Sequence, residues 1–499
     1  MTLDVSRSAR SPVRNLLNTV AFILGSVLIV LALAMSASSV VSVVNREFQA
    51  AMWIAIGAGI TAASGYGMRM VAHKPASLTL KEGFATVGLA WAVFSLFGSL
   101  PYLLTGTITS VTDAVFESTS GFTTTGFSTI ADPSTLPVGI SFWRGLTQWV
   151  GGMGVIVLGV IVLPLLGTGG VQQLARAESS GHDPDRLTPR FRETAKRLIL
   201  VYLVITALEV LLLWVGDMSG FQAVIHSFTT VATGGFSTEP TSIAGFSTYT
   251  QIVIAVFMVA SGVSFALHFR AFSGPGEYLR NSEFRLYILI VIAAAVIVSG
   301  GLWLEQGATD AVRLGSFNAI SVVTGTGFTS ANIGLWRPAL QIMLIGLMFL
   351  GGMAGSTSGA IKTFRIGVLA KAAFADVRRV VHPKAVLLTK FGHKTVPTNV
   401  VEAVQSFFLF YMMIFMMGTF LVAFIDANVS EELDLITAAS AVASSMGNVG
   451  AGLGQVGPGG PGFENFPFVA KWLLSGLMIV GRLEIFPVLV LFTKDLWRR

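Results

Sequence analysis

The hydrophobic positions of this chain form runs longer than the helices of a water-soluble core need. After a polar start, one run extends from Leu16 to Val44, and two more cover 50–71 and 84–104. Each is close to or above the ~20 residues with which an α-helix crosses a bilayer. Ala32-Leu33-Ala34 resembles a signal cleavage site, but a signal core has only about 7 to 15 apolar residues. We therefore interpret the first run as a retained transmembrane helix.

From the third run onward the pattern repeats a unit of three segments. A long apolar run is followed by a less apolar segment of about a dozen residues and then by a second long run. The middle segment is too short to span, which indicates a re-entrant helix. Together with the first two runs, the four units predict ten spans. The units cover 84–104, 111–121 and 142–166; 198–215, 221–232 and 251–267; 286–304, 311–323 and 339–369; and 401–425, 433–446 and 468–492.

A glycine-rich motif follows each short segment. Aligning the four copies superposes Gly126, Gly235, Gly327 and Gly450, at spacings of 109, 92 and 123 residues. A motif recurring at such intervals indicates a repeat architecture. Irregular backbone at membrane depth is tolerated only where it is buried in protein or lines a water-filled path. The four motifs are therefore expected to meet on a common axis.

Composition and charge support a membrane protein rather than a nucleic-acid-binding one. The chain is 53% hydrophobic and 12% charged, whereas a soluble domain carries roughly 25% charged residues. Its net charge of +6 comes from basic residues around 73–81, 176–197, 270–285, 362–394 and 494–499, the expected inner loops. The expected outer segments collect carboxylates, among them Asp113, Glu117 and Asp310, with few basic residues such as Arg144. This distribution follows the positive-inside rule, with both termini cytoplasmic.

The motif supplies backbone carbonyls more than reactive side chains. Glycine permits conformations that present carbonyls to an axis, and rings of carbonyls can replace the hydration shell of a cation, as in potassium-channel filters. The fourth copy, Asn448-Val-Gly-Ala-Gly452, is closest to the channel sequence Thr-Val-Gly-Tyr-Gly, which favours K⁺, and outer carboxylates would concentrate cations at the mouth. A helix-packing seam or plain loop is the alternative interpretation of such a stretch. The expected K⁺-coordinating residues are Thr124, Thr125, Gly126, Phe127, Thr233, Gly234, Gly235, Phe236, Gly325, Thr326, Gly327, Phe328, Asn448, Val449, Gly450 and Ala451.

The predicted fold is an all-α integral membrane protein with four potassium-channel-like helix–pore-helix–helix repeats around one pore, preceded by two extra transmembrane helices. The expected boundaries are 1–75 for the two-helix extension and 76–185, 186–275, 276–385 and 386–499 for the four repeats.

Nearly the whole chain resembles the Trk/Ktr/HKT superfamily and, within it, the TrkH-type potassium-translocating subunits. Besides the four glycine motifs, the likeness rests on Gln148-Trp-Val-Gly-Gly-Met-Gly-Val-Ile156, Leu187-Thr-Pro-Arg190 with Glu193-Thr-Ala-Lys196, Phe265-Ala-Leu-His-Phe269, Gly351-Gly-Met-Ala-Gly-Ser-Thr-Ser-Gly-Ala-Ile-Lys362 and Gly481-Arg-Leu-Glu484. The resemblance implies potassium uptake across a bacterial inner membrane. It also implies a homodimer, with one pore per protomer, and a cytosolic ring of nucleotide-binding regulatory subunits. K⁺ is then the transported ion, and no cofactor is expected.

A second functional element is expected where the last run of the third unit is interrupted by Gly, Ser and Thr, because these residues disfavour a continuous helix. The stretch resembles the intramembrane gating loop of the family, although Ser358 and Ala360 stand where glycine is expected, which indicates a stiffer loop. The alternative is an ordinary kink. An intramembrane Arg482 is the second gating candidate, with snorkelling or pairing to Glu484 as alternatives. The expected gate residues are Gly351, Gly352, Gly355, Ser356, Thr357, Gly359, Lys362 and Arg482.

Other functions have weaker support. The match of 452–457 to G-x-G-x-x-G lacks the strand and helix of a dinucleotide site, and the histidines lack metal-ligand spacing in a chain without cysteine. The absence of a carboxylate–histidine pair near the motif hydroxyls argues against an enzyme. An ion-coupled alternating-access transporter would need inverted repeats and intramembrane carboxylates, whereas the four units run alike. A Na⁺-conducting relative stays open as an alternative, although Gly126 argues against it, because plant-type relatives with serine there favour Na⁺.

Overall fold

The computed structural model describes residues 12–73, 79–161, 187–272, 274–385, 387–392, 394–427 and 434–494. Almost all of the regular structure is helical, which confirms the expected all-α fold; strand is confined to a small hairpin of β1 (Lys390–Phe391) and β2 (Lys394–Thr395). The expected basic positions at 74 and 176–186 and at the chain ends lie outside the described residues. The helices are α1 (Pro12–Val44), α2 (Phe48–Val71), α3 (Leu80–Gly98), α4 (Leu100–Leu104), α5 (Val111–Phe122), α6 (Val138–Ile161), α9 (Leu187–Val215), α10 (Gly220–Val231), α11 (Thr248–Ser261), α12 (Phe265–Ala271), α13 (Gly276–Arg280), α14 (Ser282–Gln306), α15 (Ala308–Thr324), α16 (Pro338–Leu347), α17 (Thr363–Val381), α18 (Thr398–Ala427), α19 (Leu435–Gly447), α20 (Phe468–Arg482) and α21 (Phe486–Leu491).

Six helices in the described ranges are long and apolar enough to cross a membrane, and α11 with α12 makes a seventh if that bent pair counts as one span. Several of the ten expected spans are not single helices. The run 251–267 bends between α11 and α12, and the run 339–369 is divided into α16 and α17 at the expected interruption. The run 468–492 breaks between α20 and α21. Apolar composition predicts membrane depth, but it does not show where backbone leaves the helix to make other contacts. For the run 142–166, α6 is described as far as Ile161.

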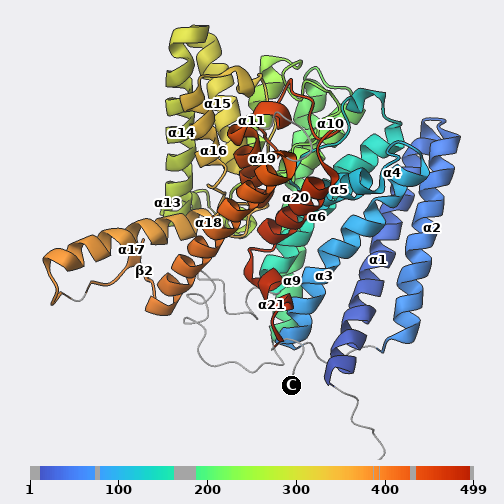
Figure 1. Ribbon diagram of the computed structural model, residues 1–499, viewed down its shortest axis with the longest axis horizontal. Coiled ribbons are helices and arrows are strands. Elements are labelled where there is room, and N and C mark those ends of the chain that lie inside the picture. The colour runs from blue at the N-terminus through green and yellow to red at the C-terminus, as the bar shows by residue number, and fades with distance from the viewer. Residues whose placement is uncertain are drawn as a thin grey trace, which may run out of the picture.

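The two extra helices α1 and α2 form a close pair on the right-hand side of Figure 1. A methyl group on Gly25 would lie 2.6 Å from the carbonyl oxygen of Gly65, so only glycine allows the two backbones to approach this closely. The outward side of the pair is apolar, as at Leu33 and Met70, which are about two-thirds exposed. Such a surface suits contact with lipid hydrocarbon.

Four short helices, α5, α10, α15 and α19, are the re-entrant segments that the repeats predict. At the starts of three of them, the side chains of Ser110, Ser219 and Asp434 accept hydrogen bonds from backbone amides of the first turn. They gather in the middle and upper part of the bundle in Figure 1, and the glycine motif directly follows the last turn of each. The negative ends of four helix dipoles therefore point toward the motifs, which favours a cation there.

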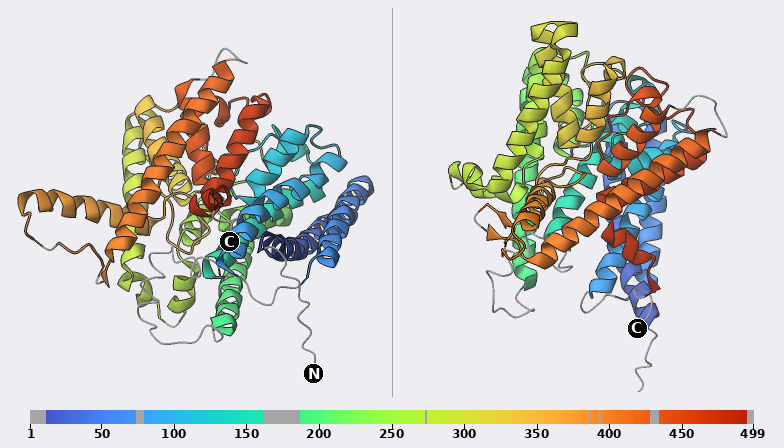
Figure 2. Two further views of the ribbon diagram at one scale, coloured as in Figure 1. Left: turned by 60° about the horizontal axis from the view of Figure 1, so that its bottom comes forward. Right: turned by 60° about the vertical axis from the view of Figure 1, so that its left-hand side comes forward.

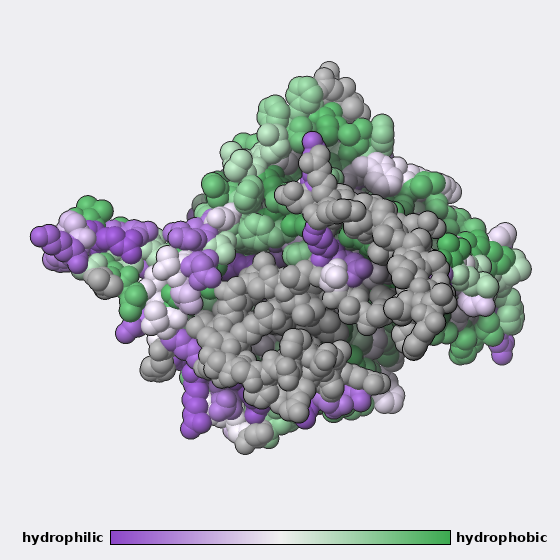
Figure 3. All heavy atoms as spheres, turned by 90° about the horizontal axis from the view of Figure 1, so that it is seen from below, coloured by the Kyte–Doolittle hydropathy of each residue, from purple (hydrophilic) through white to green (hydrophobic). Residues whose placement is uncertain are grey.

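Helix α17 and the β1–β2 hairpin project from the bundle beside the start of the long α18 (Figures 1 and 2). Phe374, Val377 and Val380 on this arm are strongly exposed. Viewed from below, hydrophilic residues gather on the arm, whereas large areas of the flanks are hydrophobic (Figure 3). The arm therefore differs from the lipid-facing helices in carrying both charged and apolar surface.

Candidate functional site

The four glycine motifs adopt one backbone conformation. Gly126, Gly235, Gly327 and Gly450 all have positive φ, at 93°, 75°, 82° and 84°. The residue two positions earlier is also left-handed in every copy, with φ between 50° and 71°; these residues are Thr124, Thr233, Gly325 and Asn448. Positive φ is strained for residues with a Cβ, so the repeated glycine is required by the conformation of the turn. We refer to Gly126, Gly235, Gly327 and Gly450 as the filter glycines.

The same hydrogen bond closes each turn. The amide of the residue before the filter glycine donates to the carbonyl oxygen of the residue five positions earlier, at 2.8 to 3.0 Å. Each bond wraps the chain back over the C-terminal turn of its pore helix. The pairs are Thr125 to Ser120, Gly234 to Thr229, Thr326 to Ser321 and Val449 to Ser444.

The four turns also meet one another in a closed ring. A Cβ on Gly126 would overlap the carbonyl oxygen of Gly234 in the second repeat. The same overlap recurs from Gly235 to Thr326, from Gly327 to Val449 and from Gly450 back to Thr125. Every filter glycine thus lies against the carbonyl that precedes the next filter glycine. The expectation that the motifs converge agrees with this geometry.

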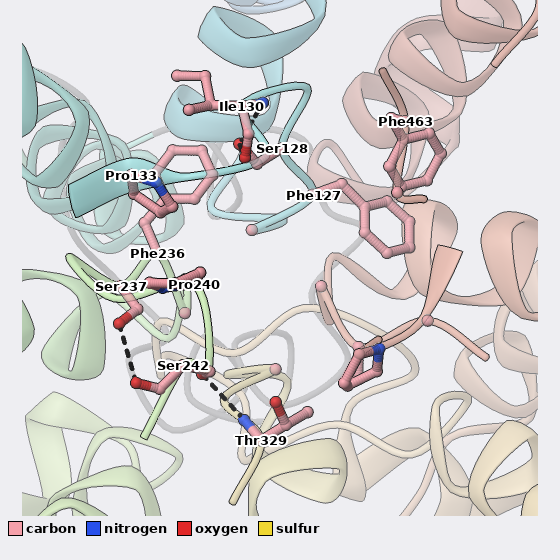
Figure 4. A pocket seen from close by; sticks show the side chains of 18 of the residues that line it. Phe127, Ser128, Ile130, Pro133, Phe236, Ser237, Pro240, Ser242, Thr329 and Phe463 are labelled. Atoms are coloured by element: carbon pink, nitrogen blue, oxygen red, sulfur yellow. Dashed lines mark hydrogen bonds between the residues drawn. The ribbon is translucent and has the colours of Figure 1, made fainter. Parts of the chain in front are cut away.

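The filter glycines lie at the floor of an open cavity. They are partly exposed, whereas their immediate neighbours in all four copies are buried. All four line a cavity of about 200 Å³, whose wall includes Phe127, Phe236 and Arg144 (Figure 4). Near the turns, some buried oxygens have no protein partner, which suits a path for water or a cation. These are the side-chain oxygens of Ser120, Thr124, Ser321 and Asn448.

The aromatic residue after the filter glycine packs against a neighbouring repeat. Phe127 contacts Phe463 of the fourth repeat, with ring centroids 4.5 Å apart. Phe236 lies under the guanidinium of Arg144 from the first repeat, and Phe328 lies beside the ring of His226 from the second. Their side chains are buried, so the rings hold the turns together, and only the backbone carbonyls of these residues are candidates for contact with an ion.

Gln148 is a functional candidate that sequence reasoning did not single out, although its motif was recognised. Its amide donates to Gly234 O at 2.8 Å and accepts from the Phe236 amide at 3.1 Å. It therefore fixes the second turn from both sides of Gly235. The signal available in the sequence was a glutamine, close to Arg144 and Thr147, inside a mainly apolar run.

The interruption in the third repeat is a buried loop from 348 to 362. Gly351 N donates to Ile361 O, and Thr363 N donates to Gly352 O, both at 3.0 Å. A Cβ on Gly359 would overlap the carbonyl of Gly447, at the end of pore helix α19. The loop therefore packs directly against the end of a pore helix, which an ordinary kink would not explain.

Thr357 ties this loop to the second repeat. Its hydroxyl contacts the carbonyl oxygen of Val231 at 3.0 Å and that of Ser261 at 3.3 Å. Gly355 O accepts from Phe265 N at 3.1 Å across the bend between α11 and α12, where the two helices meet at 99°. The other expected gate residues, Ser356 and Lys362, bond within the loop, and Lys362 Nζ donates to Ser358 O.

The two departures from glycine in this loop have distinct structural consequences. The hydroxyl of Ser358 accepts from Gly352 N at 2.9 Å, so serine closes the loop with a bond that glycine would lack. Ala360 has φ of 52°, where glycine would be less strained. The bond from Gly352 N to Ser358 Oγ is a specific reason to expect a stiffer loop.

Arg482 lies at the end of α20 and is 5% exposed. Its Nη1 donates to the carbonyl oxygen of Thr357 at 2.8 Å. Glu484 instead pairs with Arg365, at 2.5 Å. The arginine is therefore directed at the loop and is not paired with Glu484, while its Nε and Nη2 have no protein partner.

Among the described residues, two further sequence patterns can be compared with the structure. Residues 454–456, inside the G-x-G-x-x-G match, form a short 3-10 helix with no βαβ unit around it. Within the described ranges, no group of three His, Asp or Glu side chains could hold a metal ion.

Comparison with known proteins gives consistent results. The sequence profile of the TrkH family, described as "Cation transport protein", matches residues 47–498. The Trk system potassium uptake protein TrkH of Salmonella typhimurium is 40% identical over 429 residues, covering 84% of this chain and 87% of the relative. The TrkH protein of Halomonas elongata is 38% identical over 487 residues, covering 96% and 98%.

The fold also matches a solved structure. The crystal structure of the potassium transporter TrkH from Vibrio parahaemolyticus superposes with a TM-score of 0.87 at 35% sequence identity. The match covers 96% of this chain and 99% of that one. The similarity therefore includes the two extra helices and all four repeats.

Proposed function

Because the chain belongs to the TrkH family of cation transport proteins, we propose that it takes up K⁺ through the ring of four filter turns. The ring itself carries this proposal. Four turns of one conformation bring backbone carbonyls and partly exposed glycines together at the floor of one cavity. Rings of carbonyl oxygens can replace the hydration shell of a monovalent cation.

The coordinating atoms are backbone carbonyls in the stretches 124–127, 233–236, 325–328 and 448–451. The side chains in these stretches pack or hydrogen-bond, as Asn448 does by donating to Thr125 Oγ1 at 3.0 Å. No chemical conversion is required for such a role, and the pore helices add the favourable ends of their dipoles.

Flow is controlled by the loop 348–362 together with Arg482. The loop lies against the ends of two pore helices, and the arginine holds it at Thr357 O. A buried positive charge at this depth also opposes the passage of a cation. Movement of the loop away from its hydrogen bonds opens the path.

The protein works as part of a larger assembly in a bacterial inner membrane, with both termini in the cytosol. The relatives are named as proteins of a Trk system, which supports an assembly with further components. These components are a second copy of the chain, in a homodimer, and a cytosolic nucleotide-binding ring.

The domains are the two-helix extension at 1–75 and repeats at 76–185, 186–275, 276–385 and 386–499. Basic residues on the α17 arm, such as Arg378 and Arg379, fit the cytosolic face.

Flux through purified protein in liposomes tests the proposal. Uptake of K⁺ or rubidium is measured against Na⁺ competition, with and without the regulatory subunit. The proposal expects K⁺ and rubidium flux without an imposed proton or Na⁺ gradient, and weak competition by Na⁺. Flux that requires such a gradient would instead support a coupled transporter, and equal flux of Na⁺ would support the sodium-conducting alternative.

A further inference from the structure

Three of the four repeats share a buried polar side chain at one position, nine residues before the filter glycine. The residues are Glu117, His226 and Asn318, each at most 1% exposed. Each contacts the short segment of backbone two to three residues after its filter glycine, which we call the outer segment. We call these three side chains the clasp residues.

The bonds of the clasp residues are similar in position and different in chemistry. Glu117 accepts from Ser128 Oγ at 3.0 Å and from Thr129 N at 2.9 Å. His226 Nε2 lies 3.1 Å from Ser237 Oγ, and Asn318 Nδ2 donates to Ser330 Oγ at 3.0 Å. All of the contacted groups lie two or three residues after a filter glycine.

The fourth repeat makes an equivalent bond from another position. Ala441 occupies the place of the clasp residue, but the hydroxyl of the preceding Ser440 accepts from Leu453 N at 3.1 Å. Leu453 lies three residues after Gly450. The outer segment is therefore hydrogen-bonded to the pore helix in every repeat, although the aligned position in the fourth repeat is an alanine.

Only the first clasp carries a charge, and it extends to a second repeat. Glu117 pairs with Arg144 on α6 at 2.9 Å, with side chains 0% and 4% exposed. Arg144 then donates to Ser128 Oγ and to Ser237 O, each at 3.2 Å. Its guanidinium covers Phe236, and it lines the cavity above the filter glycines. One ion pair thus joins the outer segments of the first and second repeats.

This burial corrects the expectation that Glu117 concentrates cations at the outer mouth. Its carboxylate accepts hydrogen bonds from the Arg144 guanidinium, from the hydroxyls of Ser128 and Thr129 and from the Thr129 amide. Removing either partner of such a buried pair destabilises the protein, because the remaining charge is left buried without an opposite charge. Its role is therefore internal to the filter.

We propose that Glu117 and Arg144 are positioning residues for ion discrimination, which hold the first and second filter turns at the spacing that distinguishes K⁺ from Na⁺. The proposal rests on the filter function above. Na⁺, the smaller ion, would be bound more favourably if the ring could contract. The buried pair prevents contraction at one side by fixing two neighbouring outer segments. The other clasp residues each hold one outer segment.

Glu117→Gln is the principal test, because glutamine keeps the shape of the side chain but replaces one acceptor oxygen by an NH₂ group, which then faces groups that donate to that oxygen in the wild type. In liposomes, we expect the K⁺ over Na⁺ permeability ratio to fall by roughly five- to tenfold, with a smaller change in K⁺ flux. Asp310→Asn is the matched control: it neutralises an exposed outer carboxylate that pairs with Arg313, and the ratio should be unchanged.

Ser128→Ala is the second variant and alters no charge. It removes the hydroxyl that both members of the pair contact, so a fall of about two- to threefold is expected. It decides the question if Glu117→Gln does not fold. A folded Glu117→Gln protein, or otherwise a Ser128→Ala protein, with the wild-type ratio would overturn the proposal. Wild-type protein that fails to select K⁺ would contradict the proposed function instead, before any variant is compared.

Discussion

The ring of filter turns and the helices that follow it differ in symmetry. In the symmetric half, four turns share φ values, closing hydrogen bonds and glycine–carbonyl contacts around a ring. In the asymmetric half, the helices after the turns differ: α6 is continuous through its described length, α11 and α12 meet at 99°, α16 and α17 are separated by a loop, and α20 ends at Arg482.

This difference separates two tasks. A ring that strips water from an ion needs equivalent contacts from all sides, so the repeats retain one turn. A gate needs an element with two arrangements, and a single asymmetric loop can supply it without disturbing the ring. The substitutions below test the two halves in turn.

The largest effect is expected from Gly126→Ala in the symmetric half. Alanine would be strained at φ of 93° and its Cβ would overlap Gly234 O, so the K⁺ over Na⁺ ratio should fall by more than about tenfold. Competitive rubidium uptake measures it. Gly476→Ala on α20 is the control, because a Cβ there meets no atom within 4 Å. Equal selectivity of both variants and the wild type would argue against the filter assignment.

Arg482→Ala tests the asymmetric half. It removes the charge-assisted bond to Thr357 O and a buried positive charge, so K⁺ flux should rise roughly three- to tenfold while selectivity is retained. Arg280→Ala is a control, since that side chain is 82% exposed. Single-channel recording distinguishes a longer open time from a larger conductance. A conductance and open time equal to those of the wild type would leave Arg482 with a packing role.

Ser358→Gly is expected to have a smaller effect in the same direction. It removes the acceptor of the Gly352 amide inside the loop, so open time should increase by about two- to threefold. The ion ratio should stay at the wild-type value, because the filter turns are untouched. A changed ratio with an unchanged open time would mean that the loop supports the filter instead of gating it.

Ala360→Gly should produce the smallest change. Relief of left-handed strain at φ of 52° is worth about 1–2 kcal/mol, and the greater backbone entropy of glycine offsets roughly 0.5–1 kcal/mol of it. Thermal unfolding in detergent should therefore show a gain in the free energy of unfolding of at most about 1.5 kcal/mol. A loss of stability would show that the alanine methyl, which is 7% exposed, packs more favourably than its strain costs.

Sequence reasoning succeeded where a physical requirement acts on each repeat by itself. Gly126 and its three counterparts could be aligned because positive φ excludes most other residues. The re-entrant segments were recognisable from lengths too short to span. Reasoning failed for Glu117, whose charge suggested an outer surface position, and for the run 468–492, whose apolar composition continues across the break after Arg482.

By itself, the sequence determined the membrane location, the four repeats and the glycines at the centre of each. Hydrophobic length and glycine conformation are local properties, so they can be read along one chain. Tertiary structure alone decided which carbonyl each glycine meets, that Arg482 contacts Thr357 O and not Glu484, and that Glu117 is neutralised by Arg144. The first two contacts join residues from different repeats, and the third joins α5 and α6 of the first repeat. All of these partners depend on how the helices pack around the axis.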